Sequence, residues 1–211
     1  ERIEESVRRI LSVKALLNLH LAKQKPDDSE PLADMLEHNR NSAERIAAKS
    51  ITLLRNRKGL IPLKLDKGAR ILLLSTPDVP AGHGSMIPFW EELKKRGYEV
   101  NYLPFKFFHT VSMVPDAYDM TILICCAQSR YGDPRGFDST IWAFMAAPLK
   151  KRLIISFGTP YYLYDVDSAD TYINAYSNSP VVQTATAKAI FGEIPFQGHS
   201  PVSMPYCFKF G

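Results

Sequence analysis

The sequence predicts an α/β protein: a three-layer α/β/α sandwich with a largely parallel central sheet, preceded by N-terminal helices. Three continuous apolar runs indicate strands that are covered on both faces, as in parallel sheets; they span residues 70–75, 120–126 and 153–157. Helical patterns lie between strands and leave connections long enough for right-handed parallel crossovers. This alternation of apolar strands and helices is typical of a layered α/β fold.

The composition indicates a globular chain with a core of its own. Its 211 residues are 45% apolar and 23% charged, which is ordinary for a folded protein. One sizeable domain with an appendage fits this length, without disulfides or metal to stabilise it. The three cysteines, Cys125, Cys126 and Cys207, do not form a disulfide pattern. We expect Cys125 and Cys126 to be buried, unreactive thiols.

Several classes of function lack support in the sequence. The net charge is only +4, and the lysines and arginines are scattered, so we expect no nucleic-acid partner. No apolar run reaches 18 residues, so we expect no membrane span. The histidines show no paired spacing for zinc and no Cys-x-x-Cys motif occurs, so we expect neither a metal nor another cofactor. The Gly-x-Ser-x-Gly signal of α/β hydrolases is also absent.

The first fifty residues are predicted to form two helices joined by a linker. An amphipathic helix is expected over residues 2–20, and its apolar stripe needs a partner. Residues 23–31 are polar and interrupt helical structure, which makes them the linker. A second helix over 38–49 leads into a short strand at 50–56. Because the chain opens inside a helix with no initiating methionine, we expect it to begin in mid-protein.

The middle of the chain predicts a clear β-α unit. After the strand at 70–75, Ser85 is expected to cap a helix that ends at Gly97. A strand at 100–103 should follow, and after the strand at 120–126 a helix over 138–147 should stop at Pro148. One side of the first of these helices should face the core with the apolar residues Met86, Phe89, Trp90 and Leu93.

The last sixty residues predict a second helix against the same sheet. The strand at 153–157 is followed by a short run at 171–176 and by Ser179-Pro180, a serine cap with proline in the first helical turn. This helix should end at Gly192, and residues 198–205 should form a turn and a short strand. Its buried face should consist of Val182, Ala185, Ala189 and Ile190.

Three stretches resemble glycoside hydrolase family 3. Residues 2–11, RIEESVRRIL, are similar to the last helix of that family's catalytic barrel. Residues 50–56 and 58–63, SITLLRN and KGLIPL, resemble the entry to its second domain. Residues 187–195 and 198–205, AKAIFGEIP and GHSPVSMP, resemble the end of that domain, except that Ser200 stands where leucine is usual.

The resemblance implies a division of the chain into three parts. Residues 1–22 would be the last helix of the preceding catalytic barrel, 23–49 a linker and connecting helix, and 50–211 the C-terminal sandwich domain. Such enzymes take their aspartate nucleophile from the barrel, so no catalytic residue is expected in this chain. The implied partners are that barrel, in the same polypeptide, and a carbohydrate substrate.

The resemblance also favours one branch of the family, the retaining β-N-acetylhexosaminidases, whose acid/base is a histidine on a barrel loop. The β-glucosidase branch uses a glutamate of the second domain, and this sequence has no convincing match to it; Glu193 is expected to be structural or solvated. Three alternatives stay open: the β-glucosidase branch, a degenerate family member, and a free-standing flavodoxin-like module that binds a small ligand or a protein.

Candidate binding residues follow from the rule that ligands bind at the carboxyl ends of parallel strands. This rule selects the loops at 76–85, 127–137 and 158–165. Each loop has a competing interpretation: a plain exposed loop for the first, polarity that reflects only contact with water for the second, and packing of the tyrosines against a neighbouring domain for the third. The substrate-binding candidates are His83, Gln128, Ser129, Arg130, Tyr131, Thr159 and Tyr161.

Overall fold

The computed structural model describes residues 1–21, 32–76, 86–104, 117–126 and 140–204. The chain divides into two compact units, Glu1–Asn41 and Ser42–Gly211. The first unit contains α1 (Arg2–Leu16) and the start of α2 (Leu32–Ser50). Both helices were predicted, although α2 begins six residues before the expected position 38. The linker expected at 23–31 lies outside the described residues.

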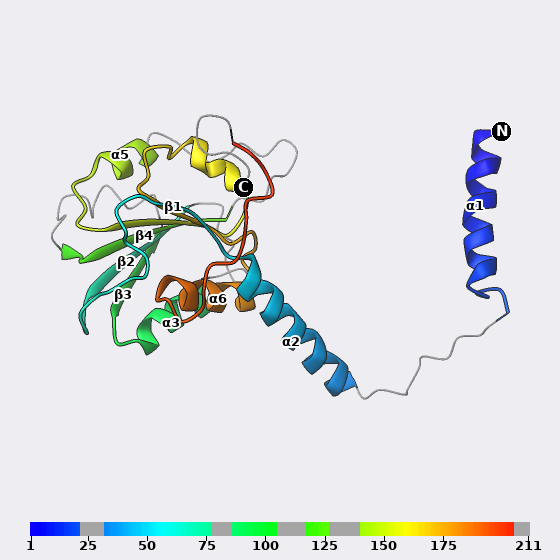
Figure 1. Ribbon diagram of the computed structural model, residues 1–211, viewed down its shortest axis with the longest axis horizontal. Coiled ribbons are helices and arrows are strands. Elements are labelled where there is room, and N and C mark those ends of the chain that lie inside the picture. The colour runs from blue at the N-terminus through cyan, green and yellow to red at the C-terminus, as the bar shows by residue number, and fades with distance from the viewer. Residues whose placement is uncertain (22–31, 77–85, 105–116, 127–139, 205–211) are drawn as a thin grey trace. The chain divides into compact units, whose positions relative to one another are not determined.

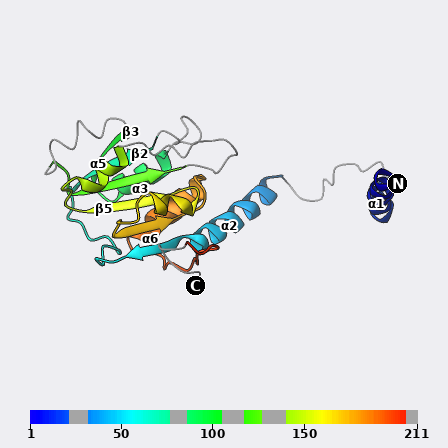
Figure 2. The same ribbon diagram turned by 90° about the horizontal axis from the view of Figure 1, so that it is seen from above.

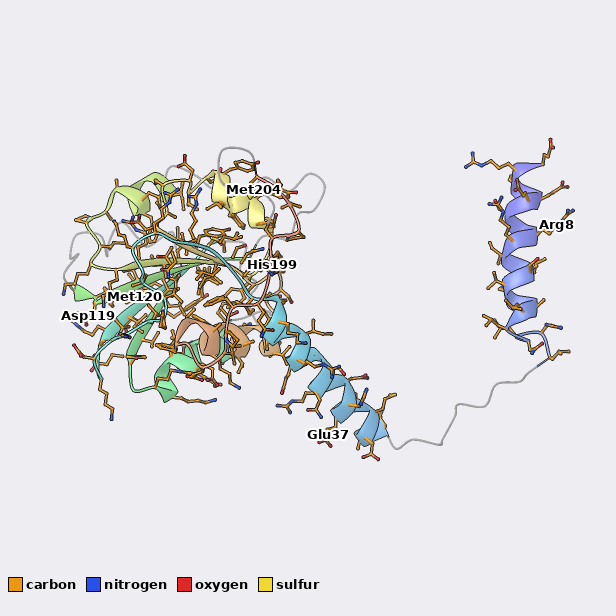
Figure 3. All side chains as sticks on the ribbon, viewed as in Figure 1. Arg8, Glu37, Asp119, Met120, His199 and Met204 are labelled. Atoms are coloured by element: carbon orange, nitrogen blue, oxygen red, sulfur yellow. The ribbon has the colours of Figure 1, made fainter. Side chains whose placement is uncertain are left out.

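Helix α1 buries none of its residues. Figure 3 shows its side chains, including that of Arg8, projecting all around the helix. The apolar members are exposed, since Ile3 is 80% exposed and Leu11 is 58% exposed. The predicted apolar stripe therefore has no partner among the described residues of its own unit.

In the second unit the described strands form one six-stranded sheet in the order β1-β6-β5-β4-β2-β3 (Figure 1). Its edge strand β1 pairs antiparallel with β6, and every other pairing is parallel, which confirms the predicted fold class. The strands are β1 (Thr52–Asn56), β2 (Arg70–Ser75), β3 (Glu99–Pro104), β4 (Met120–Cys125), β5 (Arg152–Ser156) and β6 (Thr171–Asn174).

Helices cover both faces of this sheet (Figures 1 and 2). One face packs against α3 (Ile87–Lys95) and α6 (Pro180–Ile190), and the other against α5 (Thr140–Ala146) and the 3₁₀ helix η4 (Pro160–Tyr164). Neighbouring residues of β2 alternate between the two cores, with Leu73 in the first and Leu72 in the second. This explains the continuous apolar runs, because both sides of each strand are buried.

The predicted faces of α3 and α6 are confirmed. Met86, Phe89 and Leu93 are buried with Trp90 packed beside them, and the four named positions of α6 are buried as well. Helix α6 starts at Pro180 and is followed by Gly192, whose φ of +75° is the left-handed conformation that favours glycine.

Serine caps were expected at the start of both α3 and α6. Ser179 is the N-cap residue of α6 and Pro180 lies in its first turn, as predicted, but the Ser179 side chain makes no capping hydrogen bond. Its backbone carbonyl instead accepts from the N–H groups of Val182 and Gln183, each at 3.0 Å. Ser85 lies outside the described residues, and the N-cap of α3 is Met86.

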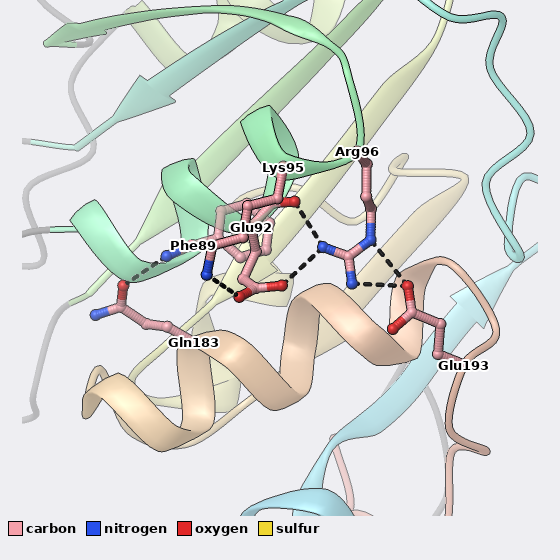
Figure 4. A network of polar contacts seen from close by, with 6 residues as sticks. All are labelled: Phe89, Glu92, Lys95, Arg96, Gln183 and Glu193. Carbon is pink, nitrogen blue, oxygen red and sulfur yellow. Dashed lines mark hydrogen bonds and ion pairs between the residues drawn. The ribbon is translucent and has the colours of Figure 1, made fainter.

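Polar contacts join α3 to α6 and to the turn that follows it (Figure 4). The Phe89 N–H donates to Oε1 of Gln183 at 3.2 Å, and Gln183 is almost completely buried. Arg96 donates to Glu92 at 2.8 Å and, through two nitrogens, to one oxygen of Glu193 at 2.7 and 2.9 Å. Glu193 therefore has a structural role, as the sequence suggested.

The segment after α6 differs from its prediction. Residues 198–203 form no strand, and Met204 makes only an isolated bridge. The segment is held instead by single contacts: the Gly198 N–H donates to the Ile51 carbonyl at 3.2 Å, and Oγ of the buried Ser200 donates to the Val202 carbonyl at 2.7 Å. Local contacts of this kind satisfy the backbone without a strand ladder.

Cys125 and Cys126 are buried, as expected, and form no disulfide with any described residue. Across the ranges that the structure describes, no helix combines the length and apolar character needed to cross a membrane.

Candidate functional site

The carboxyl ends of the parallel strands bring polar residues together at one edge of the sheet. Ser75 ends β2, Ser156 ends β5 and Asn174 ends β6. Parallel pairing places Ser156 opposite Asn174 and opposite Cys125 of β4. The edge therefore presents hydroxyl and amide groups, at the place where ligands bind to open α/β sheets.

The β2 end of this edge is tied together by hydroxyl groups. Tyr102 of β3 donates its phenolic O–H to Oγ of Ser75 at 2.7 Å. Thr76 donates both its backbone N–H, at 3.0 Å, and its hydroxyl, at 3.2 Å, to the carbonyl of Ile124. These bonds fix the point at which the chain leaves β2.

The chain after β5 is organised by Ser156 and Thr159. Oγ of Ser156 donates to the Thr159 carbonyl at 2.8 Å and accepts from the Gly158 N–H at 3.3 Å. Thr159 is the N-cap of η4, because its Oγ1 accepts from the Tyr161 N–H at 3.3 Å. Thr159 therefore positions Tyr161, the other candidate on this loop.

The three tyrosines of η4 divide into two classes. Tyr162 is 1% exposed and belongs to the core beneath η4. Tyr161 and Tyr164 are 39% and 41% exposed, and their rings lie nearly parallel at 3°, with centroids 6.5 Å apart. Two exposed, parallel aromatic faces offer a flat apolar surface for a ligand or a neighbouring domain.

Asn174 is an unusual residue for the end of a strand. Its side chain is fully buried, and neither its amide nitrogen nor its amide oxygen has a hydrogen-bond partner within the described part of the chain. Two residues later, Tyr176 has a φ of +64°, and its hydroxyl donates to Oγ1 of Thr52 at 3.2 Å. Buried amides without partners are rare and costly, which makes this corner of the edge a candidate position for a bound water or ligand.

Tyr172 of β6 is a buried ionisable residue near this edge. Burial, before any other cause, raises the pKa of Tyr172 well above its usual range, so its phenol stays protonated. Within the described ranges, no group of three or more histidine, cysteine, aspartate or glutamate residues is placed to hold a metal ion. The described residues of the edge thus supply neutral donors, acceptors and aromatic faces, which suits binding.

The structure brings together only some of the predicted site residues. Thr159 and Tyr161 lie on the η4 loop at the carboxyl edge. Ser156 and Asn174 were not predicted as site residues, although a polar residue that ends an apolar strand was a visible signal. The remaining candidates lie outside the described residues; they are His83, Gln128, Ser129, Arg130 and Tyr131.

Comparison with known proteins gives related chains but no matching family model. The chain is 29% identical over 224 aligned residues to a protein of Cellulomonas fimi named beta-N-acetylglucosaminidase/beta-glucosidase. That alignment covers 96% of this chain but only 39% of the relative. The chain therefore spans about two fifths of the length of this relative.

Solved structures agree with the sequence comparison. The beta-glucoside phosphorylase BglX matches with a TM-score of 0.74 and 28% identity, over 98% of this chain and 39% of that one. The fold also matches a glycoside hydrolase family 3 beta-N-acetylglucosaminidase from Paenibacillus sp. str. FPU-7, with a TM-score of 0.69 and 24% identity over 94% of this chain. The matched regions are C-terminal portions of these enzymes. The chain is therefore similar in sequence and in fold to the C-terminal portion of glycoside hydrolase family 3 enzymes, as the resemblance implied.

Proposed function

We propose that this chain is the companion domain of a family 3 glycosidase, with the catalytic nucleophile in a barrel domain that precedes Glu1. The parent enzyme would be a β-N-acetylhexosaminidase that removes terminal β-linked sugars with retention of configuration and without a metal. The observation that carries this proposal is the match over 96% of this chain to 39% of a relative named for both N-acetylglucosaminide and glucoside cleavage.

The surface of α1 supports a partner of this kind. A shallow hollow on the helix is lined by Ile3, Val7, Leu11 and Ala15. Burying these apolar side chains against a partner would be favourable, because it removes apolar surface from water. An amphipathic helix of this length obtains most of its stability from packing of its apolar face. The barrel is the partner that we propose for this face, with residues 1–22 as its last helix and 23–49 as the connection to the sandwich.

The carboxyl edge would then border the substrate. The parallel faces of Tyr161 and Tyr164 would contact a sugar ring, and Thr159 would hold Tyr161 in position. We propose His83, Gln128, Ser129, Arg130 and Tyr131, on the loops after β2 and β4, as further binding residues. None of these residues would transfer protons or form the covalent intermediate.

The chemistry of a retaining glycosidase determines which groups the barrel would have to supply. A retaining glycosidase needs a nucleophile and an acid/base at about 5 Å from each other, on opposite sides of the scissile bond. Glu193, a carboxylate of this unit, is engaged by two nitrogens of Arg96 at 2.7 and 2.9 Å. Glu193 is therefore unsuited to act as the acid/base, and we propose that the reactive pair lies upstream while this chain binds and shields the substrate.

The test uses a longer product that includes the residues encoded upstream of Glu1, with this chain alone as the control. Both are assayed on chromogenic β-N-acetylglucosaminide and β-glucoside. We expect the longer product to cleave the N-acetylglucosaminide faster and the 211-residue chain to cleave neither. Faster cleavage of the glucoside would support the β-glucosidase branch instead.

A second reaction is favoured by one relative in particular. Because BglX is named a beta-glucoside phosphorylase, phosphate is a second candidate acceptor for the glycosyl group. The same assay with and without inorganic phosphate separates the two reactions, since a phosphorylase releases a sugar phosphate and a hydrolase releases the free sugar.

A further inference from the structure

The edge of the sheet opposite the candidate site carries two adjacent hollows. The parallel strands β2, β4, β5 and β6 all begin there, and Figure 3 labels Asp119 at the start of β4. The hollows have volumes of about 400 and 410 Å³ and share Lys150 and Lys151. Together they form one continuous surface, which we name the basic edge.

Most of the chain's positive excess gathers on the basic edge. Its lining contains six cations and three carboxylates, a balance of +3 (6 − 3) out of the chain's net +4. In the sequence these cations lie in two groups, at 58–67 and at 150–152; the fold brings the groups together, and Nζ of Lys151 donates to the carbonyl of Lys64, 87 positions away, at 3.4 Å. The cations are Lys58, Lys64, Lys67, Lys150, Lys151 and Arg152.

Some of these cations are engaged by protein carboxylates and others are not. Lys58 pairs with Asp170 at 2.6 Å, and Lys150 lies 3.4 Å from Asp119. Lys64 and Lys67 are exposed and make no ion pair with any described residue. An exposed ammonium without a carboxylate partner attracts anions over about 8 Å at physiological ionic strength.

The carboxylates of the basic edge have oxygen lone pairs left for further hydrogen bonds, although Asp119 and Asp170 each pair with a lysine. The hydrogen bond from the Arg70 backbone N–H, and then the Lys150 ammonium, hold the pKa of Asp119 below its usual value of 3.8. Asp119 is therefore ionised at neutral pH. Carboxylates spaced among ammonium groups can accept hydrogen bonds from sugar hydroxyls while the lysines bind acidic groups.

We propose that the basic edge binds an acidic polysaccharide, a chain of sugars that carries carboxylate groups. The ammonium groups would bind the acidic substituents, and Asp66, Asp119 and Asp170 would accept from the hydroxyls. This site is separate from the proposed substrate edge, because the parallel strands begin at one and end at the other. It would hold the protein on an anionic glycan without taking part in bond cleavage.

The composition of the lining favours an acidic glycan over a nucleic acid. Single-stranded nucleic acids are bound largely by stacking of bases on aromatic side chains, and neither hollow is lined by an aromatic residue. Three carboxylates among six cations would also repel a closely spaced phosphate backbone. Sparser acidic groups on a hydroxyl-rich polymer avoid that repulsion.

The experiment measures binding of the 211-residue chain to polygalacturonate by calorimetry, with neutral dextran and an oligothymidylate of similar charge as comparison ligands. The test variant carries Lys64→Gln, Lys67→Gln and Lys151→Gln. The matched control removes three exposed lysines elsewhere in the same unit, with Lys49→Gln, Lys95→Gln and Lys188→Gln. Circular dichroism and thermal unfolding check that both variants fold.

We expect polygalacturonate to bind, dextran not to bind, and added salt to weaken binding. The test variant should bind polygalacturonate at least about tenfold more weakly. A plot of log K against log salt should have a slope shallower by about one for each removed cation that contacts the polymer. The control should stay within about twofold of the parent. Equal weakening in both variants, unchanged binding in the test variant, or oligothymidylate binding as tight as polygalacturonate would overturn the proposal.

Discussion

The contact between Gln183 and the start of α3 gives the sharpest stability prediction. The first N–H groups of a helix have no partner within the helix, and here the side chain of Gln183 accepts from the Phe89 N–H at 3.2 Å. Its Nε2 also donates to the Asn178 carbonyl at 2.7 Å. Because Gln183 is 1% exposed and Phe89 is fully buried, water cannot replace the bond to the Phe89 N–H.

The change Gln183→Met keeps the length of the side chain and removes both hydrogen bonds. Leaving one buried N–H without a partner costs about 1–3 kcal/mol, so we expect a loss of about 2 kcal/mol in the free energy of unfolding. For a unit of this size that loss lowers Tm by about 4–8 °C. Urea titration, monitored by circular dichroism, should show a lower midpoint with an unchanged m value.

The matched control is Lys188→Met, which introduces the same side chain at an exposed position of α6. We expect this control to lie within about 0.5 kcal/mol of the parent. If Gln183→Met were as stable as the control, the capping of α3 by this side chain would contribute nothing and the reasoning would be refuted.

Three further changes test other contacts. Gly198→Ala should cost more than about 2 kcal/mol in urea unfolding, since its Cβ would lie 2.3 Å from the Ser50 carbonyl oxygen; wild-type stability would contradict this. The pKa of Glu92 lies below its usual 4.5, first because of Arg96 and then Lys95, so this stabilisation is present above pH 4.5 and lost as pH falls through the lowered pKa. Arg96→Leu should therefore lower Tm at pH 7 and flatten its fall in acid, and parallel Tm curves for variant and parent would count against the pair. Asn174→Leu should raise the free energy of unfolding by about 1 kcal/mol, because it removes a buried amide that has no partner among the described residues; a loss of stability would argue that the amide is hydrogen-bonded in solution.

Much of the fold could be predicted because its strongest signals are local. The apolar runs that became β2, β4 and β5 are buried on both faces, and such strands leave a continuous pattern in the sequence. The pairing of β1 with β6 could not be predicted in this way, because Thr52 meets Asn174 across more than a hundred intervening residues. The short strand expected within the turn and strand at 198–205 does not form over residues 198–203, where single contacts, such as that of Gly198 with Ile51, hold the segment.

The candidate site and the proposed basic edge were harder to predict than the strands. The rule for parallel sheets correctly placed Thr159 and Tyr161 at the carboxyl edge. Asn174 was missed because its burial without a partner depends on strands that are distant in sequence. The basic edge was missed for the same reason, since Lys64 and Lys151 meet only after the sheet has formed.

The account's central claim is that the reactive carboxylate lies outside these 211 residues. Treating the longer product with an activated fluoroglycoside traps the covalent glycosyl intermediate of a retaining enzyme, and peptide mass spectrometry then locates the label. We predict a single labelled aspartate on a peptide upstream of Glu1. A label on any residue between Glu1 and Gly211 would contradict the account.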